Sequence, residues 1–265
     1  ISSIEPNLCH DGVIDFVANS KRFAPHFHMP LQSGSDVILE RMRRRYDTAL
    51  YADRVAHIKR VIPHACIGVD VITGTPGETE GEFQKTHEFI RSIPVDYLHV
   101  FTYSERANTT AVRMEDVIPM ETRRERTKKL RILSSKLQRA FYEKHSGAMR
   151  QVLFETEDHD GKMLGFTDNY IRVSMPFDLT LVNTVIPVEL GRINADGHCE
   201  GTSSTSEANA AQFKPLQGLT HRTQHSQNTS SPAEDLAVHL ETAGSLRTSG
   251  DPTEVSNSLI IQSAN

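Results

Sequence analysis

The chain has 265 residues, of which 37% are hydrophobic and none is tryptophan, and its formal net charge is −5. This length allows one large domain or two small ones, and the low apolar content predicts that part of the chain lies outside any core. No apolar run approaches the roughly 18–20 residues that span a bilayer, so we expect a soluble protein without a membrane-spanning helix.

The three cysteines, Cys9, Cys66 and Cys199, are widely separated in the sequence. Their odd number and the absence of a CxxC pair argue against a disulfide framework and supply no zinc or cluster motif. This cysteine usage fits a reducing compartment. We therefore expect buried or incidental thiols in a cytoplasmic protein.

Strands and helices alternate in the first part of the chain. Apolar runs predict the end of a strand at 1–6 and complete strands at 27–31, 66–73 and 95–101. Apolar residues at helical spacing predict helices at 11–21, 36–45, 48–61 and 80–91. Short connections between the two kinds of element predict parallel βα units, as in a barrel or an open doubly wound sheet.

The turn after the strand at 66–73 is the best candidate for a ligand site. Gly74, Pro76 and Gly77 break the strand, and Thr79 can cap the next helix. Such turns let backbone N–H groups approach a phosphate, a ribose or an adenine at a strand end. No Gly-Lys-Ser/Thr follows, so this is not a P-loop. A plain βα turn is the alternative interpretation.

Two further groups of residues have both a functional and a structural interpretation. His26 and His28 lie two apart on a strand and share a face, but no third metal ligand follows at usable spacing, which favours ordinary histidines. The segment 103–106, Tyr-Ser-Glu-Arg, follows a predicted strand. Its arginine could grip a carboxylate or a phosphate, or it could belong to a structural turn.

The segment 122–145 is the clearest predicted helix and is strongly basic. Between residues 121 and 150 there are ten Lys or Arg against three acidic residues. A solvated helix face and a nucleic-acid-facing surface both explain this charge. We single out Arg124, Lys128 and Arg131 as candidate substrate-binding residues.

The pattern changes twice after this helix. Short strand candidates at 152–154, 169–173 and 184–190, separated by turn signals, predict a small β-barrel or sandwich. Residues 201–265 contain nineteen Ser or Thr and one aromatic residue. Such a composition buries too little apolar surface to offset the entropy of ordering, which predicts a disordered tail.

Several motifs in one order resemble the radical-SAM methylthiotransferases over roughly residues 1–192. They are SSIEP at 2–6, HFHMPLQSGS at 26–35, MRRRY at 42–46, DVI at 70–72 with PGET at 76–79, and LHVFTYSER at 98–106. The HVFTYSER and MRRRY forms are most similar to the MtaB-like branch, which acts on threonylcarbamoyladenosine beside the tRNA anticodon. The branches that act on isopentenyl-adenosine or on a ribosomal protein fit less well.

The resemblance implies an α/β fold with four regions. Residues 1–120 would be the second half of a partial (β/α)6 radical-SAM barrel, with 1–6 as the end of its third strand. Residues 121–147 would be a basic connecting helix, and 148–195 a small all-β TRAM-like barrel of the kind that holds tRNA. Residues 196–265 would be the disordered tail.

The resemblance also implies the cofactor and its contacts. Tyr103 and Arg106 would lie near S-adenosylmethionine (SAM) or the substrate base. Thr75 stands where the family has an aromatic residue and Thr73 where it has valine, which weakens the case for apolar cover over SAM. The residues that would bind SAM are Gln32, Ser33, Asp70, Ile72, Gly74 and Gly77.

The family's CxxxCxxC motif, which ligates a 4Fe-4S cluster, is absent from this chain. We therefore expect a fragment that by itself neither builds the cluster nor turns over. One alternative is a non-catalytic RNA-binding module that uses the basic helix and the small barrel. Another is a different barrel enzyme that holds a phosphate-bearing ligand at 74–79.

Overall fold

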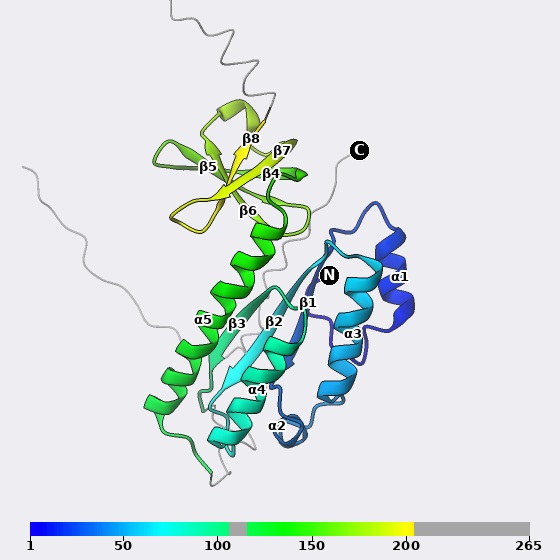
Figure 1. Ribbon diagram of the computed structural model, residues 1–265, viewed down its shortest axis with the longest axis vertical. Coiled ribbons are helices and arrows are strands. Elements are labelled where there is room, and N and C mark those ends of the chain that lie inside the picture. Colours follow the sequence, from blue (N-terminus) through cyan, green and yellow to red (C-terminus); the bar gives the residue numbers. More distant parts are fainter. Residues whose placement is uncertain (106–115, 204–265) are drawn as a thin grey trace, which may run out of the picture. The chain divides into compact units, whose positions relative to one another are not determined.

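The computed structural model describes residues 1–105 and 116–203, apart from the side chains of 157–159. Three parallel strands, β1 (His26–Gln32), β2 (Cys66–Thr73) and β3 (Tyr97–Thr102), form a sheet in the order β1-β2-β3 (Figure 1). This confirms the parallel βα units that the sequence predicted. Membership of a six-stranded barrel stays a prediction.

The helices begin at side-chain caps that the sequence supplies. Ser35 accepts the Ile38 N–H, and Thr79 accepts the Glu82 N–H, at the first turns of their helices. The second helix is shorter than predicted because Arg43 has a left-handed backbone, with φ +56°. The helices of this region are α1 (Asp11–Asn19), α2 (Asp36–Arg41), α3 (Thr48–Val61), α4 (Glu80–Ser92) and α5 (Met120–Lys144).

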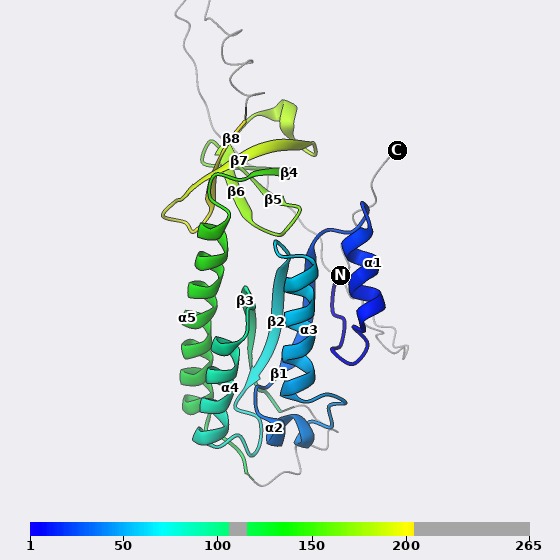
Figure 2. The same cartoon turned by 45° about the vertical axis from the view of Figure 1, so that its right-hand side comes forward.

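The two faces of the sheet differ in chemistry. One face packs on the helices and forms the core, with side chains such as Phe27, Val69 and Leu98. Figure 2 shows α3 beside the β1 end of the sheet and α5 beside the β3 end. The alternate residues of the strands point to the other face, which is polar and aromatic: His26, His28, Asp70, Tyr97 and His99. None of the described helices is long and apolar enough to cross a bilayer.

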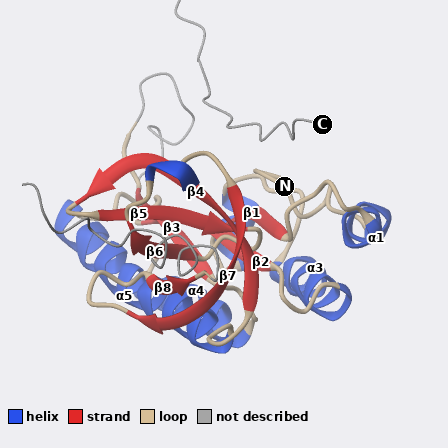
Figure 3. Cartoon of the chain, turned by 90° about the horizontal axis from the view of Figure 1, so that it is seen from above, coloured by secondary structure: helices blue, strands red, loops and turns tan. Residues whose placement is uncertain are grey.

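A closed five-stranded barrel follows α5 (Figure 3). Its strands run in the order β4-β5-β6-β8-β7, antiparallel except for the β6–β8 pair. The small barrel is as the sequence predicted, while its TRAM identity stays a prediction. Its elements are β4 (Met149–His159), β5 (Lys162–Thr167), β6 (Arg172–Pro176), the 3-10 helix η2 (Leu179–Leu181), β7 (Val185–Ile193) and β8 (Cys199–Thr202).

The barrel extends beyond its predicted end at residue 195, because β8 pairs with both β6 and β7. The strand escaped sequence analysis because only Cys199 in it is apolar. Gly201 is needed for closure, since a Cβ there would lie 2.7 Å from the side chains of Val173 and Val188. The predicted tail beginning at 196 is corrected accordingly. Its remainder, 204–265, lies outside the described residues.

The barrel contacts the N-terminal ends of the sheet strands. The rings of His26 and Tyr170 stack with centroids 4.2 Å apart, and His26 Nε2 is hydrogen bonded to the Tyr97 hydroxyl at 2.9 Å. Asn169 Nδ2 donates to the His64 carbonyl at 3.0 Å. Burial in this contact lowers the pKa of His26 to about 3. The C-terminal ends of the three strands, at the opposite edge of the sheet, take no part in these contacts.

Candidate functional site

Each of the three parallel strands ends at a polar side chain with a buried atom that has no hydrogen-bond partner in the described structure. These atoms are Gln32 Oε1 at the end of β1, Thr75 Oγ1 after β2 and the Tyr103 hydroxyl after β3. The C-terminal ends of parallel strands meet at one edge of a sheet, so the three side chains share that edge. An unpartnered buried polar group costs about 1–3 kcal/mol. The edge is therefore suited to a ligand with hydrogen-bonding groups.

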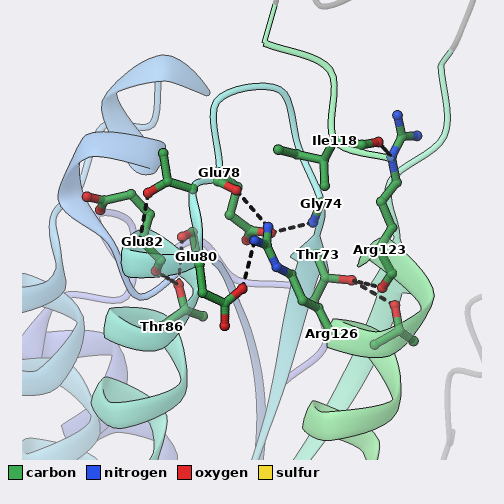
Figure 4. A network of polar contacts seen from close by, with 12 residues as sticks. Thr73, Gly74, Glu78, Glu80, Glu82, Thr86, Ile118, Arg123 and Arg126 are labelled. Carbon is green, nitrogen blue, oxygen red and sulfur yellow. Dashed lines mark hydrogen bonds and ion pairs between the residues drawn. The ribbon is translucent and has the colours of Figure 1, made fainter. Parts of the chain in front are cut away.

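The turn after β2 is held by the fully buried Glu78 (Figure 4). The Gly74 N–H donates to Glu78 Oε2 at 2.6 Å, and Arg126 Nη1 donates to the same oxygen at 2.9 Å. Arg126 Nη2 donates to Glu80 Oε2 at 3.0 Å. Burial raises the pKa of the Glu78 carboxyl, and the Gly74 N–H and Arg126 oppose that rise. Since the Gly74 N–H bonds a carboxylate of the chain itself, this turn does not suit a phosphate.

The two glycines of the turn admit arginine side chains from neighbouring elements. Gly74 has φ +77° and Gly77 has φ +83°, a left-handed backbone that favours glycine. A Cβ on Gly74 would overlap the Arg123 side chain, and a Cβ on Gly77 would overlap the guanidinium of Arg41. This packing explains both glycines. Their contact with an adenosine stays a prediction.

Asp70 and Ile72 lie on the face of the sheet that does not pack on the helices. His28 Nε2 donates to Asp70 Oδ1 at 2.7 Å, and the His28 and His99 ring centroids are 5.2 Å apart. Burial lowers the pKa of His99. The sequence favoured an ordinary histidine at position 28, because the Asp70 partner follows only from the strand register, which aligns Pro30 with Asp70.

The other predicted site residues lie in different surroundings. Ser33 is fully buried and hydrogen bonded to Thr86 of α4 at 3.1 Å, so its hydroxyl already has a partner within the fold. The ring of Tyr103 contacts Arg123, whose guanidinium carbon lies 5.2 Å from the ring centroid. Arg106 lies outside the described residues.

A cationic groove of about 350 Å³ runs along α5 beside the end of β3. Arg124, Lys128 and Arg131, the three cations that we singled out from the sequence, all line it, with Thr102 and Ser135. The three side chains belong to exposed residues, and none takes part in an ion pair within the described ranges. They are therefore available to an anionic ligand.

Two other arginines of α5 are structural. Arg123 is 3% exposed and donates to Glu105 at 2.5 Å and to the Tyr103 carbonyl at 3.0 Å. Arg126 is 5% exposed and bonds Glu78. Neither role was predicted from the sequence. Neither role has a local signal, because the glutamates that pair with these arginines, Glu105 and Glu78, lie 18 and 48 residues away.

The cysteines of this chain do not fit a metal cluster. Cys9, Cys66 and Cys199 are free and buried, on a loop, on β2 and on β8 respectively. Burial raises the pKa of all three thiols, that of Cys199 to about 11, whereas a metal ligand must be a thiolate. Within 1–105 and 116–203, no three His, Cys, Asp or Glu side chains converge on a possible metal position.

This chain is similar in sequence to known proteins over most of its described length. The Radical SAM superfamily matches residues 2–90. The chain is 35% identical over 194 residues to threonylcarbamoyladenosine tRNA methylthiotransferase MtaB of Bacillus subtilis, which covers 72% of this chain and 43% of that protein. It is 37% identical over 183 residues to tRNA-2-methylthio-N(6)-dimethylallyladenosine synthase of Symbiobacterium thermophilum, covering 68% and 39%.

Among solved structures, coproporphyrinogen III oxidase (HemN) of Escherichia coli, described as a radical SAM enzyme, matches with a TM-score of 0.44 and 17% identity. The match covers 51% of this chain and 31% of that chain. The chain spans less than half the length of the curated relatives above.

Proposed function

We propose that this chain, which is similar in sequence to the radical SAM tRNA methylthiotransferases, contributes cofactor-binding strands and an RNA-binding surface to such an enzyme. The proposed reaction adds a methylthio group to threonylcarbamoyladenosine next to the anticodon of tRNA. The proposed cofactor is SAM.

The observation that carries this proposal is the set of unpartnered buried oxygens of Gln32, Thr75 and Tyr103 at one edge of the sheet. SAM has a purine, ribose hydroxyls and an amino-acid group, so it offers hydrogen-bond donors to such oxygens. Asp70 and Ile72 would line the same ligand from the helix-free face. When bound, SAM would supply the methyl group and the radical chemistry of the reaction.

The groove on α5 supports RNA as the substrate. Its three cations, Arg124, Lys128 and Arg131, have no ion-pair partner in the described ranges and suit the phosphates of a nucleic acid. We further propose that the five-stranded barrel is TRAM-like and binds the same RNA. The groove lies beside the end of β3, so RNA held there would be close to the proposed cofactor edge.

The choice of the threonylcarbamoyl branch rests on two observations. The first is the pair of motifs HVFTYSER and MRRRY. Sequence identity does not separate the branches, since the chain is 35% identical to the threonylcarbamoyladenosine enzyme and 37% identical to the dimethylallyladenosine enzyme. The second is charge, since a threonylcarbamoyl group carries a carboxylate whereas a dimethylallyl group is apolar. An acidic substituent suits the cationic groove better, because guanidinium groups bind carboxylates in bidentate fashion.

Calorimetric titration of the full chain with SAM tests the proposal. We expect SAM to bind, and Gln32→Ala to weaken binding about tenfold, the loss of one hydrogen bond worth about 1.4 kcal/mol. Gln84→Ala is the matched control, because Gln84 is a glutamine of α4 that is hydrogen bonded to Glu88. ATP provides the comparison with a simple nucleotide phosphate.

Two outcomes would overturn the cofactor assignment. One is equal binding of SAM by the wild type and Gln32→Ala. The other is RNA binding without SAM binding, which would support a non-catalytic RNA-binding module built on α5 and the barrel. The three available cations of the groove favour that second candidate as well.

A further inference from the structure

A second cavity, of about 280 Å³, lies beside the β1 end of the sheet. We call it the arginine pocket; it is lined by Glu5, Asn7 and Leu8 and by Arg43, Arg44 and Arg45. None of these residues belongs to the proposed cofactor edge or to the groove on α5. The pocket lies between the N-terminal segment and the loop after α2.

The loop that carries the arginines is held firmly against β1. Tyr46 is buried, and its hydroxyl lies 2.9 Å from the Pro30 carbonyl and 3.2 Å from the Leu31 carbonyl. The Arg44 N–H donates to the Leu39 carbonyl at 2.9 Å. The arginines are therefore presented by a fixed backbone near the C-terminal end of β1.

Two buried polar atoms of the pocket have no partner in the described structure. They are Asn7 Oδ1, an acceptor, and Arg44 Nε, a donor. Arg44 also bonds Glu5 through Nη1 at 3.1 Å. A ligand that satisfies both atoms must offer an acceptor to the arginine and a donor to the asparagine.

The charge of the pocket selects an anion. Three arginines against one glutamate leave a formal charge of +2. Arg43 and Arg45 are exposed, and no ion pair found within 1–105 and 116–203 involves either of them. Guanidinium groups match the geometry of phosphate oxygens.

We propose that the arginine pocket binds one nucleotide of an RNA strand. The phosphate would bond Arg43, Arg44 and Arg45, and the ribose 2′-hydroxyl would donate to Asn7 Oδ1. The 2′-hydroxyl is the group by which a protein distinguishes RNA from DNA. This inference rests on the proposed function in taking RNA as the substrate. It adds an RNA contact on the β1 side of the sheet, whereas the groove on α5 lies on the β3 side.

The test measures binding of an anticodon stem–loop RNA, and of the DNA of the same sequence, to the full chain at several salt concentrations. Arg43→Gly with Arg45→Ala removes two cations, and glycine suits the left-handed backbone of Arg43, so this variant is expected to fold. We expect RNA affinity to fall about tenfold and the slope of log K against log salt to shrink by about one. Arg60→Ala, an exposed cation of α3, is the matched control and should change affinity less than twofold.

Asn7→Leu tests the sugar contact, because it removes the acceptor and leaves the charge unchanged. RNA binding should weaken severalfold while DNA binding stays the same. Equal weakening of both would overturn the assignment of the 2′-hydroxyl. The proposal would be overturned if the Arg43/Arg45 variant bound RNA as tightly as the unmodified chain does. If the unmodified chain also bound inorganic phosphate, the pocket would then be a site for a free anion. Wild-type chain that binds no RNA would count against the proposed function as well.

Discussion

Arg126 donates to Glu78 across 48 positions of sequence, at 2.9 Å to the side-chain Oε2 and at 2.6 Å to the backbone carbonyl. The contact joins α5, which carries the cationic groove, to the turn at the proposed cofactor edge. Both side chains are buried, at 5% and 1% exposure. Because neither group is solvated, the loss of one partner leaves the other charge buried without compensation.

We expect Arg126→Met to lower the free energy of unfolding by about 3–5 kcal/mol, the typical cost of breaking a buried ion pair. Urea denaturation followed by circular dichroism measures the change. Lys129→Met is the matched control, because Lys129 is half-exposed and its partner Glu125 is exposed. Its cost should be below about 1 kcal/mol. Equal effects in the two variants would contradict a special role for the buried pair.

Acid is expected to destabilise the contact between the sheet and the barrel through His26. Burial lowers the pKa of His26 to about 3 from an ordinary value of 6.5, so between these values the unfolded chain binds more protons than the folded chain. The stabilisation is therefore fully present above pH 6.5 and is lost as the pH falls toward 3. One such group contributes at most about 1.4 kcal/mol per pH unit.

Unfolding free energies of the wild type and His26→Phe between about pH 4.5 and 7.5 provide the measurement. Phenylalanine keeps a ring against Tyr170, which stacks on His26 at 4.2 Å, but cannot titrate. The variant should show a smaller dependence on pH than the wild type. His10→Phe serves as the control, since His10 is an exposed histidine that directly precedes α1. Parallel pH profiles for the wild type and His26→Phe would refute the assignment.

The groove on α5 should control the salt dependence of tRNA binding. Arg124→Ala with Lys128→Ala is expected to weaken binding and to reduce the slope of log K against log salt by roughly 0.7–0.9 for each phosphate that the protein no longer neutralises. Arg139→Ala removes a cation from the same helix that is paired with Glu143 at 2.8 Å, and it should leave the slope nearly unchanged. If all of these substitutions act alike, net charge rather than the groove determines binding.

We expect this chain by itself to bind no stoichiometric iron after anaerobic incubation with iron and sulfide, and not to cleave SAM. The reason is that Cys9, Cys66 and Cys199 are buried on separate elements and their pKa values are raised. Iron analysis and thiol alkylation before and after denaturation measure this. Stoichiometric iron with SAM cleavage would contradict it, as would rapid alkylation of the native thiols.

Local patterns predicted most of the elements of the α/β region. The helix expected at 122–145 is α5, Met120–Lys144, because leucines at three- and four-residue steps mark its buried face. The strand expected at 66–73 is β2, because its apolar run is buried and ends at glycine. By contrast, the strand expected at 169–173 begins only at Arg172, since Tyr170 has φ +69°.

The sequence by itself determined the parallel βα units, the basic helix and the resemblance to the radical SAM methylthiotransferases, because spacing and motifs are properties of neighbouring residues. Only the tertiary structure decided which cations of α5 are available, since Arg126 finds its partner 48 residues away while Arg124 finds none in the described ranges. It also decided how the barrel closes, because β8 forms a strand by pairing with β6 and β7 and its own composition does not predict one. Likewise, the polar atoms of Gln32, Thr75 and Tyr103 became a candidate site only when three strand ends met at one edge.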